Sequence, residues 1–225
     1  VLNDYSLEVC STVISNNDVT PPVITVNQGS ETYLLGSDYV EVGATAVDET
    51  DGDLTNAITI DTTNLPNSGL AMDVIGDFDV LYSVNDAAGN TGQATRTVSV
   101  IDNVAPEVEL IGNIVIEIDV FSTYAEPGYT ASDNYDANPQ VIETGTVDTS
   151  LLGGYTLTYI AIDASGNEST PKYRTVVVKD NEAPLITLVG DNPYEINQGD
   201  IYEEPGASAI DNYDSTVTVN ISGNV

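Results

Sequence analysis

Carboxylates are the residues of this sequence that could do chemistry, and they recur in clusters at fixed positions. Three acidic clusters each begin five residues after a glycine, at residues 48–53, 133–138 and 211–214. Ca²⁺ takes six to eight oxygen ligands at about 2.3–2.6 Å, which carboxylates, carbonyls and water supply, whereas Mg²⁺ prefers few protein ligands in a strict octahedron. The clusters therefore predict bound Ca²⁺ rather than Mg²⁺.

Several kinds of catalytic and metal chemistry are excluded by composition. The sequence has no His and one Cys, Cys10, so it lacks Ser-His and Cys-His catalysis, His/Cys zinc sites and an internal disulfide. Cys10 lies in an apolar run and is predicted to be a core residue. A carboxylate pair could in principle hydrolyse glycosides, but short repeats offer no obvious cleft. The sequence predicts a protein that is not an enzyme.

The charge of the chain limits its partners. The 36 acidic residues outnumber the 4 basic ones, and the net charge is −32. Nucleic acids and anionic membrane surfaces repel such a chain, whereas divalent cations relieve its self-repulsion. No apolar stretch approaches the roughly 20 residues of a membrane span, so we expect neither nucleic-acid binding nor membrane insertion. A simpler explanation, that the acidity only maintains solubility, stays open.

Internal repetition defines the domain organisation. Units begin at Pro22, Pro106 and Pro184, and each continues with a Tyr-x-Glu-x-Gly motif and an acidic cluster. An Asp-x-x-Gly-Asn turn follows at residues 86–90 and 163–167. We predict the tail strand (about residues 5–15) and linker of a preceding unit over 1–20, repeat 1 over 21–104, repeat 2 over 105–182, and an incomplete repeat 3 over 183–225.

Each unit has the pattern of an all-β domain. Apolar and polar residues alternate over 79–84 and 156–162, turn signals recur at short intervals, and no segment shows a sustained helical period. About seven short strands in roughly 80 residues predict tandem immunoglobulin-like β-sandwich repeats. Tyr82 and Tyr159 occupy matching positions and are predicted to be partly buried with bonded hydroxyls. The matching Arg96 and Arg174 are predicted to pair with carboxylates.

The order of these motifs resembles a known family. Pro-x-Ile-Thr-Leu, Tyr-x-Glu-Pro-Gly, the acidic cluster, Asp-x-x-Gly-Asn and Arg-Thr-Val are similar to the bacterial Ig-like repeat found in a pesticidal crystal protein and in large bacterial surface and secreted proteins. The resemblance covers nearly the whole chain and implies an Ig-like fold, an extracellular setting and no catalytic activity. A looser similarity to cadherin repeats, whose linkers and loops hold calcium, implies the same ion, although the linkers here contain fewer acids.

Strand topology predicts where the carboxylates meet. Because strands alternate in direction, the acidic loop and the Asp-x-x-Gly-Asn turn lie at one end, facing the linker and the first turn of the preceding unit. The predicted calcium ligands are Glu41 and Asp102 with Asp133, Asp136 and Asp163; Glu126, Asp180 and Glu182 with Asp211 and Asp214; and Asp18 with Asp48, Asp51, Asp53 and Asp86. Turn chemistry alone also explains Asp86 and Asp163, and solvated glutamates remain an alternative for the Tyr-x-Glu-x-Gly motifs.

The sequence is compatible with three functions. The first is a structural spacer or stalk of an adhesin-like bacterial surface or secreted protein, stiffened by calcium between neighbouring Ig-like units of the same or an adjacent chain. The second is an extracellular filament subunit assembled by strand complementation. The third is a carbohydrate- or protein-binding module of a secreted enzyme, in which Tyr135 and Tyr213 would contact a glycan or a surface-protein ligand.

Overall fold

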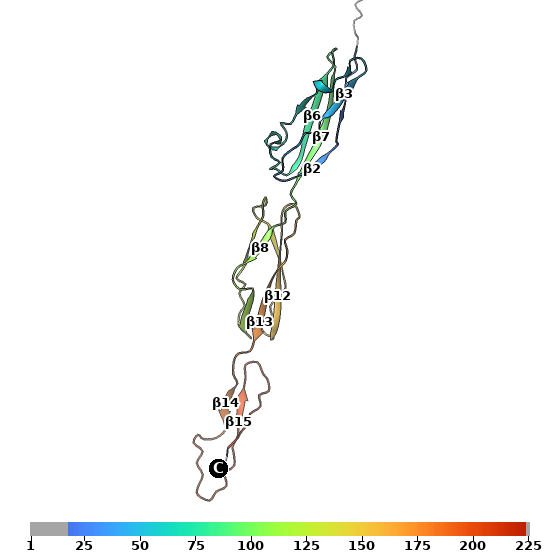
Figure 1. Ribbon diagram of the computed structural model, residues 1–225. Helices are drawn as coiled ribbons and strands as arrows, with labels where there is room; N and C mark the ends of the chain where they lie inside the picture. The colour runs from blue at the N-terminus through green and yellow to red at the C-terminus, as the bar shows by residue number, and fades with distance from the viewer. Residues whose placement is uncertain (1–17, 224–225) are drawn as a thin grey trace, which may run out of the picture. The chain divides into compact units, whose positions relative to one another are not determined.

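The computed structural model describes residues 18–223, and its regular secondary structure is almost entirely β-strand (Figure 1). The predicted tail strand over residues 5–15, with Cys10, lies outside the described residues. The chain divides into two compact units, Val1–Asn103 and Val104–Val225. No helix in the described part of the chain has the length and apolar character needed to cross a membrane.

The first unit is a sandwich of two sheets. Its smaller sheet has the order β1-β3-β4 and its larger sheet the order β2-β7-β6-β5, in which β2 runs parallel to β7 and the other pairs are antiparallel. Two 3₁₀ turns, η1 (Thr55–Ala57) and η2 (Pro66–Gly69), lie in the connections. The strands are β1 (Val23–Val26), β2 (Glu31–Leu34), β3 (Ala44–Asp48), β4 (Gly52–Asp53), β5 (Thr59–Asp61), β6 (Gly76–Asn85) and β7 (Thr91–Ile101).

The core of the first sandwich follows the predicted alternation. Along β6 the side chains of Val80, Tyr82 and Val84 are buried while their neighbours are more exposed. The connection between β5 and β6 contributes to this core, because Leu65 and Met72 are 3 % and 0 % exposed. This connection is therefore part of the core of the first sandwich as well as a link between two strands.

The second unit contains a similar sandwich followed by a shorter β segment. One sheet pairs β8 with β10, and the other has the order β11-β12-β13-β9, with β9 parallel to β13. Val108, Tyr159 and Ala161 form its buried cluster. The strands are β8 (Glu107–Leu110), β9 (Val115–Asp119), β10 (Tyr129–Ser132), β11 (Gln140–Thr144), β12 (Gly153–Ile162) and β13 (Lys172–Lys179).

The remaining segment consists of the antiparallel pair β14 (Leu185–Leu188) and β15 (Ala207–Ile210). All four residues of β14 are exposed, in contrast to the inward-facing residues of β8. The predicted fold class, all-β with tandem immunoglobulin-like sandwiches, is confirmed.

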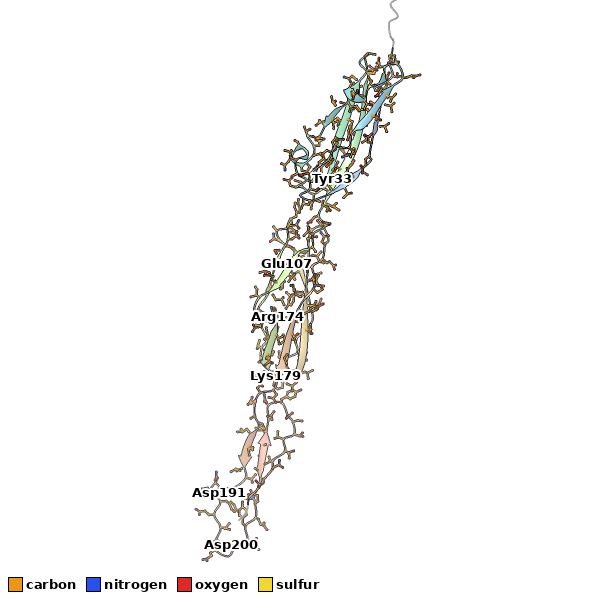
Figure 2. The ribbon with its side chains drawn as sticks, in the orientation of Figure 1. Tyr33, Glu107, Arg174, Lys179, Asp191 and Asp200 are labelled. Carbon is orange, nitrogen blue, oxygen red and sulfur yellow. The ribbon has the colours of Figure 1, made fainter. Side chains whose placement is uncertain are left out.

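A buried charge cluster holds the second sandwich together. The side chain of Arg174, which is labelled in Figure 2, is fully buried, and its Nε lies 2.9 Å from the Glu126 carboxylate. The guanidinium also donates to the carbonyl oxygens of Ile111, Gly128 and Asn113. Burial acts to raise the pKa of Glu126, but the Tyr124 hydroxyl, the Gly128 amide and Arg174 outweigh it, so the pKa lies below its ordinary value.

The first sandwich has the same cluster with changed partners. Glu41 accepts hydrogen bonds from the hydroxyls of Tyr39 (2.5 Å) and Tyr82 (2.7 Å) and from the Gly43 amide (2.6 Å). Arg96 donates to the Tyr39 hydroxyl at 2.8 Å and lies 3.6 Å from Glu31. Tyr82 has the predicted bonded hydroxyl, and the prediction that both arginines pair with carboxylates is confirmed. Tyr82 and Tyr159 are both fully rather than partly buried. The Tyr159 hydroxyl has no hydrogen-bond partner among residues 18–223, so the bond predicted for it is not found.

We expect Arg174→Met to lower the free energy of unfolding of the second sandwich by about 3–5 kcal/mol, because it leaves Glu126 and three carbonyls without their buried partner. Urea unfolding monitored by circular dichroism checks this value. The matched control is Lys179→Met, since Lys179 pairs with Glu117 on the surface with both side chains substantially exposed. That change should cost less than about 1 kcal/mol, and equal losses in the two variants would contradict a central role for the buried cluster.

Candidate cation site

Three carboxylates meet at one end of the first sandwich. Asp18 precedes β1, Asp48 is the last residue of β3, and Asp51 lies in the turn to β4. One carboxylate oxygen from each residue lies within 4.8 Å of the others. The turn is tight because Gly52, with φ of 77°, pairs directly with Asp48. Like charges at this spacing repel each other, so the arrangement favours a bound cation.

Asp48 shows how this turn leaves a carboxylate oxygen available. Its Oδ1 accepts hydrogen bonds from the amides of Thr50 (2.8 Å) and Asp51 (3.0 Å). The side chain is 3 % exposed, and its Oδ2 is buried with no hydrogen-bond donor among residues 18–223. A buried anionic oxygen without a donor is unfavourable, and a metal ion would remove that penalty.

Asp18 brings the linker into the same cluster. Its Oδ1 accepts from the amide (3.0 Å) and hydroxyl (2.7 Å) of Thr20, and these bonds lower the pKa of Asp18 below its ordinary value. Its Oδ2 is also buried without a donor in the described part of the chain. The main-chain carbonyl of Asp18 accepts a 3.1 Å hydrogen bond from the Asn90 side chain. The linker is thereby tied to the turn between β6 and β7.

The β6–β7 turn closes the other side of the site. Asn90 donates from its amide to Oδ1 and from its side chain to Oδ2 of Asp86, both at 2.7 Å, while Gly89 adopts φ of 93°. The amide of Ala87 donates to Asp51 Oδ2 at 2.9 Å. Asp86 therefore has the turn role that was one of its two predicted explanations, and the turn also anchors the acidic loop. The sequence predicts Asn90 only as a turn residue, whereas its side chain also binds the linker carbonyl of Asp18, and its recurrence as Asn167 is the sequence signal for that role.

The second sandwich repeats this arrangement. Asp133 Oδ2 accepts from the Asp136 amide at 3.0 Å, and Asp136 Oδ2 accepts from the Ala164 amide at 3.0 Å. Asp163 Oδ1 accepts from the Asn167 amide at 2.7 Å. The expectation that the acidic loop and the Asp-x-x-Gly-Asn turn share one end is thus met in both sandwiches. Participation of Asp102, which matches Asp18 in the repeat, stays a prediction.

Other predicted ligands are engaged elsewhere. The carboxylates of Glu41 and Glu126 point into their own sandwiches, where they accept hydrogen bonds from tyrosine hydroxyls and backbone amides, and Glu126 also pairs with Arg174. We therefore do not retain these two residues as junction ligands. Asp53 is exposed and accepts from the Thr55 amide at 2.9 Å. Exposure and a local turn bond place Asp53 outside the cluster.

The acids predicted for the next junction form local turns. Asp180 accepts from the Glu182 amide at 3.1 Å, and Asp211 accepts from the amides of Tyr213 and Asp214, both at 2.9 Å. Within residues 18–223 no close group of three acidic side chains includes any of Asp180, Glu182, Asp211 or Asp214. The sequence after 183 also has no Asp-x-x-Gly-Asn turn to complete such a group.

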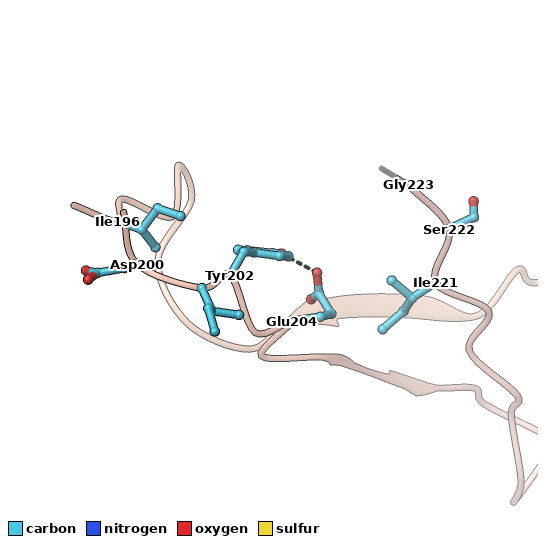
Figure 3. A pocket seen from close by; sticks show the side chains of 8 residues that line it. Ile196, Asp200, Tyr202, Glu204, Ile221, Ser222 and Gly223 are labelled. Carbon is cyan, nitrogen blue, oxygen red and sulfur yellow. Dashed lines mark hydrogen bonds between the residues drawn. The ribbon is translucent and has the colours of Figure 1, made fainter. Parts of the chain in front are cut away.

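A hollow of about 850 Å³ next to β15 is not a comparable site. It is lined by Ile196, Ile201, Tyr202, Glu204 and Ile221, among others (Figure 3). The Tyr202 hydroxyl donates to Glu204, as Tyr39 does to Glu41 in the first sandwich. In that sandwich β6 and β7 place Tyr82 and Arg96 against the cluster, so the hollow corresponds to sandwich interior rather than to a ligand pocket.

Comparison with known proteins places the chain in a family. The model of the bacterial surface protein Ig-like domain matches residues 24–100 and 108–178. An uncharacterized 81.3 kDa protein of Acholeplasma phage L2 is 32 % identical over 185 residues, covering 78 % of this chain and 24 % of that protein.

Two named relatives are also similar. Hyalin of Strongylocentrotus purpuratus is 30 % identical over 225 residues, with 93 % of this chain and 18 % of hyalin covered. The serine-rich adhesin for platelets of Staphylococcus aureus (strain MSSA476) is 26 % identical over 196 residues, with 77 % and 8 % covered. The chain thus spans about a quarter or less of the length of these three relatives.

Among solved structures, fibronectin(III)-like modules of Clostridium thermocellum CbhA match with a TM-score of 0.33 and 14 % identity, over 71 % of this chain and 94 % of that one. The family match covers both complete sandwiches and agrees with their motifs. The chain belongs to the family of bacterial surface protein Ig-like domains.

Proposed function

We propose that this chain is a non-catalytic spacer segment of an adhesin-like bacterial protein on the cell surface or secreted, in which Ca²⁺ bound by linker and loop carboxylates stiffens the connection between repeats. Membership of a bacterial surface family supports the extracellular setting. The platelet adhesin and hyalin are relatives that are much longer than this chain, which covers 8 % and 18 % of their lengths. Such repeated, short domains suit a structural role.

The observation that carries the cation proposal is the buried Oδ2 of Asp48 beside the carboxylates of Asp18 and Asp51. One carboxylate oxygen of each of the three residues lies within 4.8 Å of the others. Asp48 and Asp18 each also have a buried Oδ2 with no donor among the described residues. Three carboxylates with the Asp18 segment and water supply the oxygen-rich, adaptable ligand set that Ca²⁺ prefers. A harder octahedral ion such as Mg²⁺ fits this loop set less well.

The repeat extends the proposal to the second sandwich. Asp102, Asp133, Asp136 and Asp163 match Asp18, Asp48, Asp51 and Asp86 in sequence. The internal bonds of Asp133, Asp136 and Asp163 reproduce those of their counterparts, which supports an equivalent cation site completed by the linker residue Asp102.

Stiffening follows from where the ligands lie in the chain. Domains joined by a linker move relative to one another by default. An ion that binds both a linker carboxylate and the loops of the following sandwich fixes the last residues of the linker. Repeated along many units, this restraint would convert a flexible string of domains into an extended spacer.

We expect Asp48→Asn to remove one calcium site. The amide keeps the Oδ1 acceptor for Thr50 and Asp51 but replaces the free anionic oxygen, so calcium affinity at this site should fall at least about tenfold, or roughly 1.4 kcal/mol. Isothermal titration calorimetry measures the loss. The control is Asp53→Asn, which changes the net charge equally in an exposed turn.

Melting temperatures of the same two variants distinguish an effect of bound calcium from an effect of charge repulsion alone. In chelator, Asp48→Asn should leave the melting temperature unchanged or raise it, because one like charge is removed. In calcium the first sandwich of Asp48→Asn should lose the ligand-induced rise in melting temperature that we expect for the parent chain. Identical calcium responses of Asp48→Asn, Asp53→Asn and the parent chain would contradict the site.

Calcium should also extend the chain in solution. Small-angle scattering of the parent chain should give a larger and better-defined maximum dimension in calcium than in chelator, because the linkers become fixed. The double variant Asp48→Asn, Asp133→Asn should scatter in calcium as the parent does in chelator. A chain with calcium bound but unchanged scattering would retain the site and reject the spacer mechanism.

A further inference from the structure

One turn occurs at the same position in all three repeats. Its backbone bond runs from Ser37 N to Leu34 O (3.0 Å), from Ser122 N to Asp119 O (3.1 Å) and from Asp200 N to Asn197 O (3.1 Å). The third residue of each turn has positive φ: 81° at Gly36, 64° at Phe121 and 96° at Gly199. Such a turn strongly favours glycine or asparagine at this place.

Phe121 is therefore an exception that its own turn does not explain. A bulky side chain at positive φ brings the β-carbon against the backbone and is unfavourable. The backbone is held in place, since Phe121 N donates to Thr149 O and Val120 N to Lys179 O, both at 2.7 Å. Phe121 as a whole is 58 % exposed, so it gains little burial in the second sandwich.

The ring of Phe121 meets an aromatic residue of the third repeat within the second unit. Its centroid lies 6.1 Å from that of Tyr213, with the planes inclined by 44°. This distance is within the range in which aromatic pairs attract each other. Tyr213 lies in the acidic loop, where its backbone amide donates a hydrogen bond to Asp211 Oδ1. In the linker, Asn181 Nδ2 donates to Asp119 Oδ1 at 2.6 Å.

We propose that Phe121 and Tyr213 form an aromatic clasp that docks the third repeat on the second without a metal ion. The clasp is specific to this junction, because the first repeat has Gly36 where the second has Phe121. The position of Tyr213 is occupied by Thr50 in the first repeat and by Tyr135 in the second repeat. The clasp thus lies at the junction whose acids do not form a close group among the described residues. The strained phenylalanine is retained for contact with the neighbouring repeat rather than for its own fold.

The test is a spin-label distance measurement in chelator. Labels are attached at Thr144→Cys and Ser208→Cys, both exposed positions, in a Cys10→Ser background. We expect a narrow distance distribution in the parent and a distribution at least about twofold broader in Phe121→Asn and in Tyr213→Ala. The control Tyr135→Ala removes the tyrosine at the matching, 45 % exposed position of the second repeat and should leave the distribution narrow.

Thermal unfolding distinguishes a role of Phe121 in docking the third repeat from a role in stabilising the second sandwich. Asparagine tolerates positive φ, so Phe121→Asn should leave the melting temperature of the second sandwich unchanged or raise it by a few degrees, about 4 °C. A broad distribution in the parent, unchanged distributions in both clasp variants, or a lowered melting temperature of the second sandwich in Phe121→Asn would overturn the proposal.

Discussion

Repulsion among carboxylates that the fold forces together is the constraint on which the first sandwich and its repeat depend. Asp18, Asp48 and Asp51 come from a linker, a strand end and a turn, yet their oxygens lie within 4.8 Å of one another. Strand direction makes this unavoidable, because β3 and β6 both end, and β1 and β7 both begin, at the same end of the sandwich. Backbone amides satisfy one oxygen of Asp48 and leave the other buried without a donor in the described chain.

The chain uses its acidic residues in two physically different ways. Glu41 and Glu126 are turned inward, where hydroxyls, amides and arginine stabilise their ionised form and lower their pKa values. The loop aspartates have no arginine or lysine partner in the described hydrogen bonds and ion pairs. Because the sequence contains only 4 basic residues, and two of them are the buried arginines, neutralisation of 36 acids must come largely from solvent cations. Tight loops that collect acids are then natural places for a divalent ion.

Much of the fold and part of the site could be predicted from the sequence because repetition and strand alternation are local signals. Val80, Tyr82 and Val84 alternate as expected, and the shared end of the acidic loop and the Asp-x-x-Gly-Asn turn followed from strand direction alone. Strand topology predicts Glu41 and Glu126 as junction ligands because Tyr-x-Glu-x-Gly lies at the first turn of its unit. Their inward orientation depends on a buried arginine and tyrosine from strands more than 40 residues later, a pairing that spacing does not reveal. The positive φ of Phe121 is a property of the backbone that its residue type does not indicate.

The most direct measurement of the central claim is anomalous diffraction from crystals grown with calcium. The account predicts a peak at the first sandwich, coordinated by oxygens of Asp18, Asp48 and Asp51 at about 2.3–2.6 Å. An ordered loop without a peak there in saturating calcium, with the same three side chains turned apart into solvent, would contradict it.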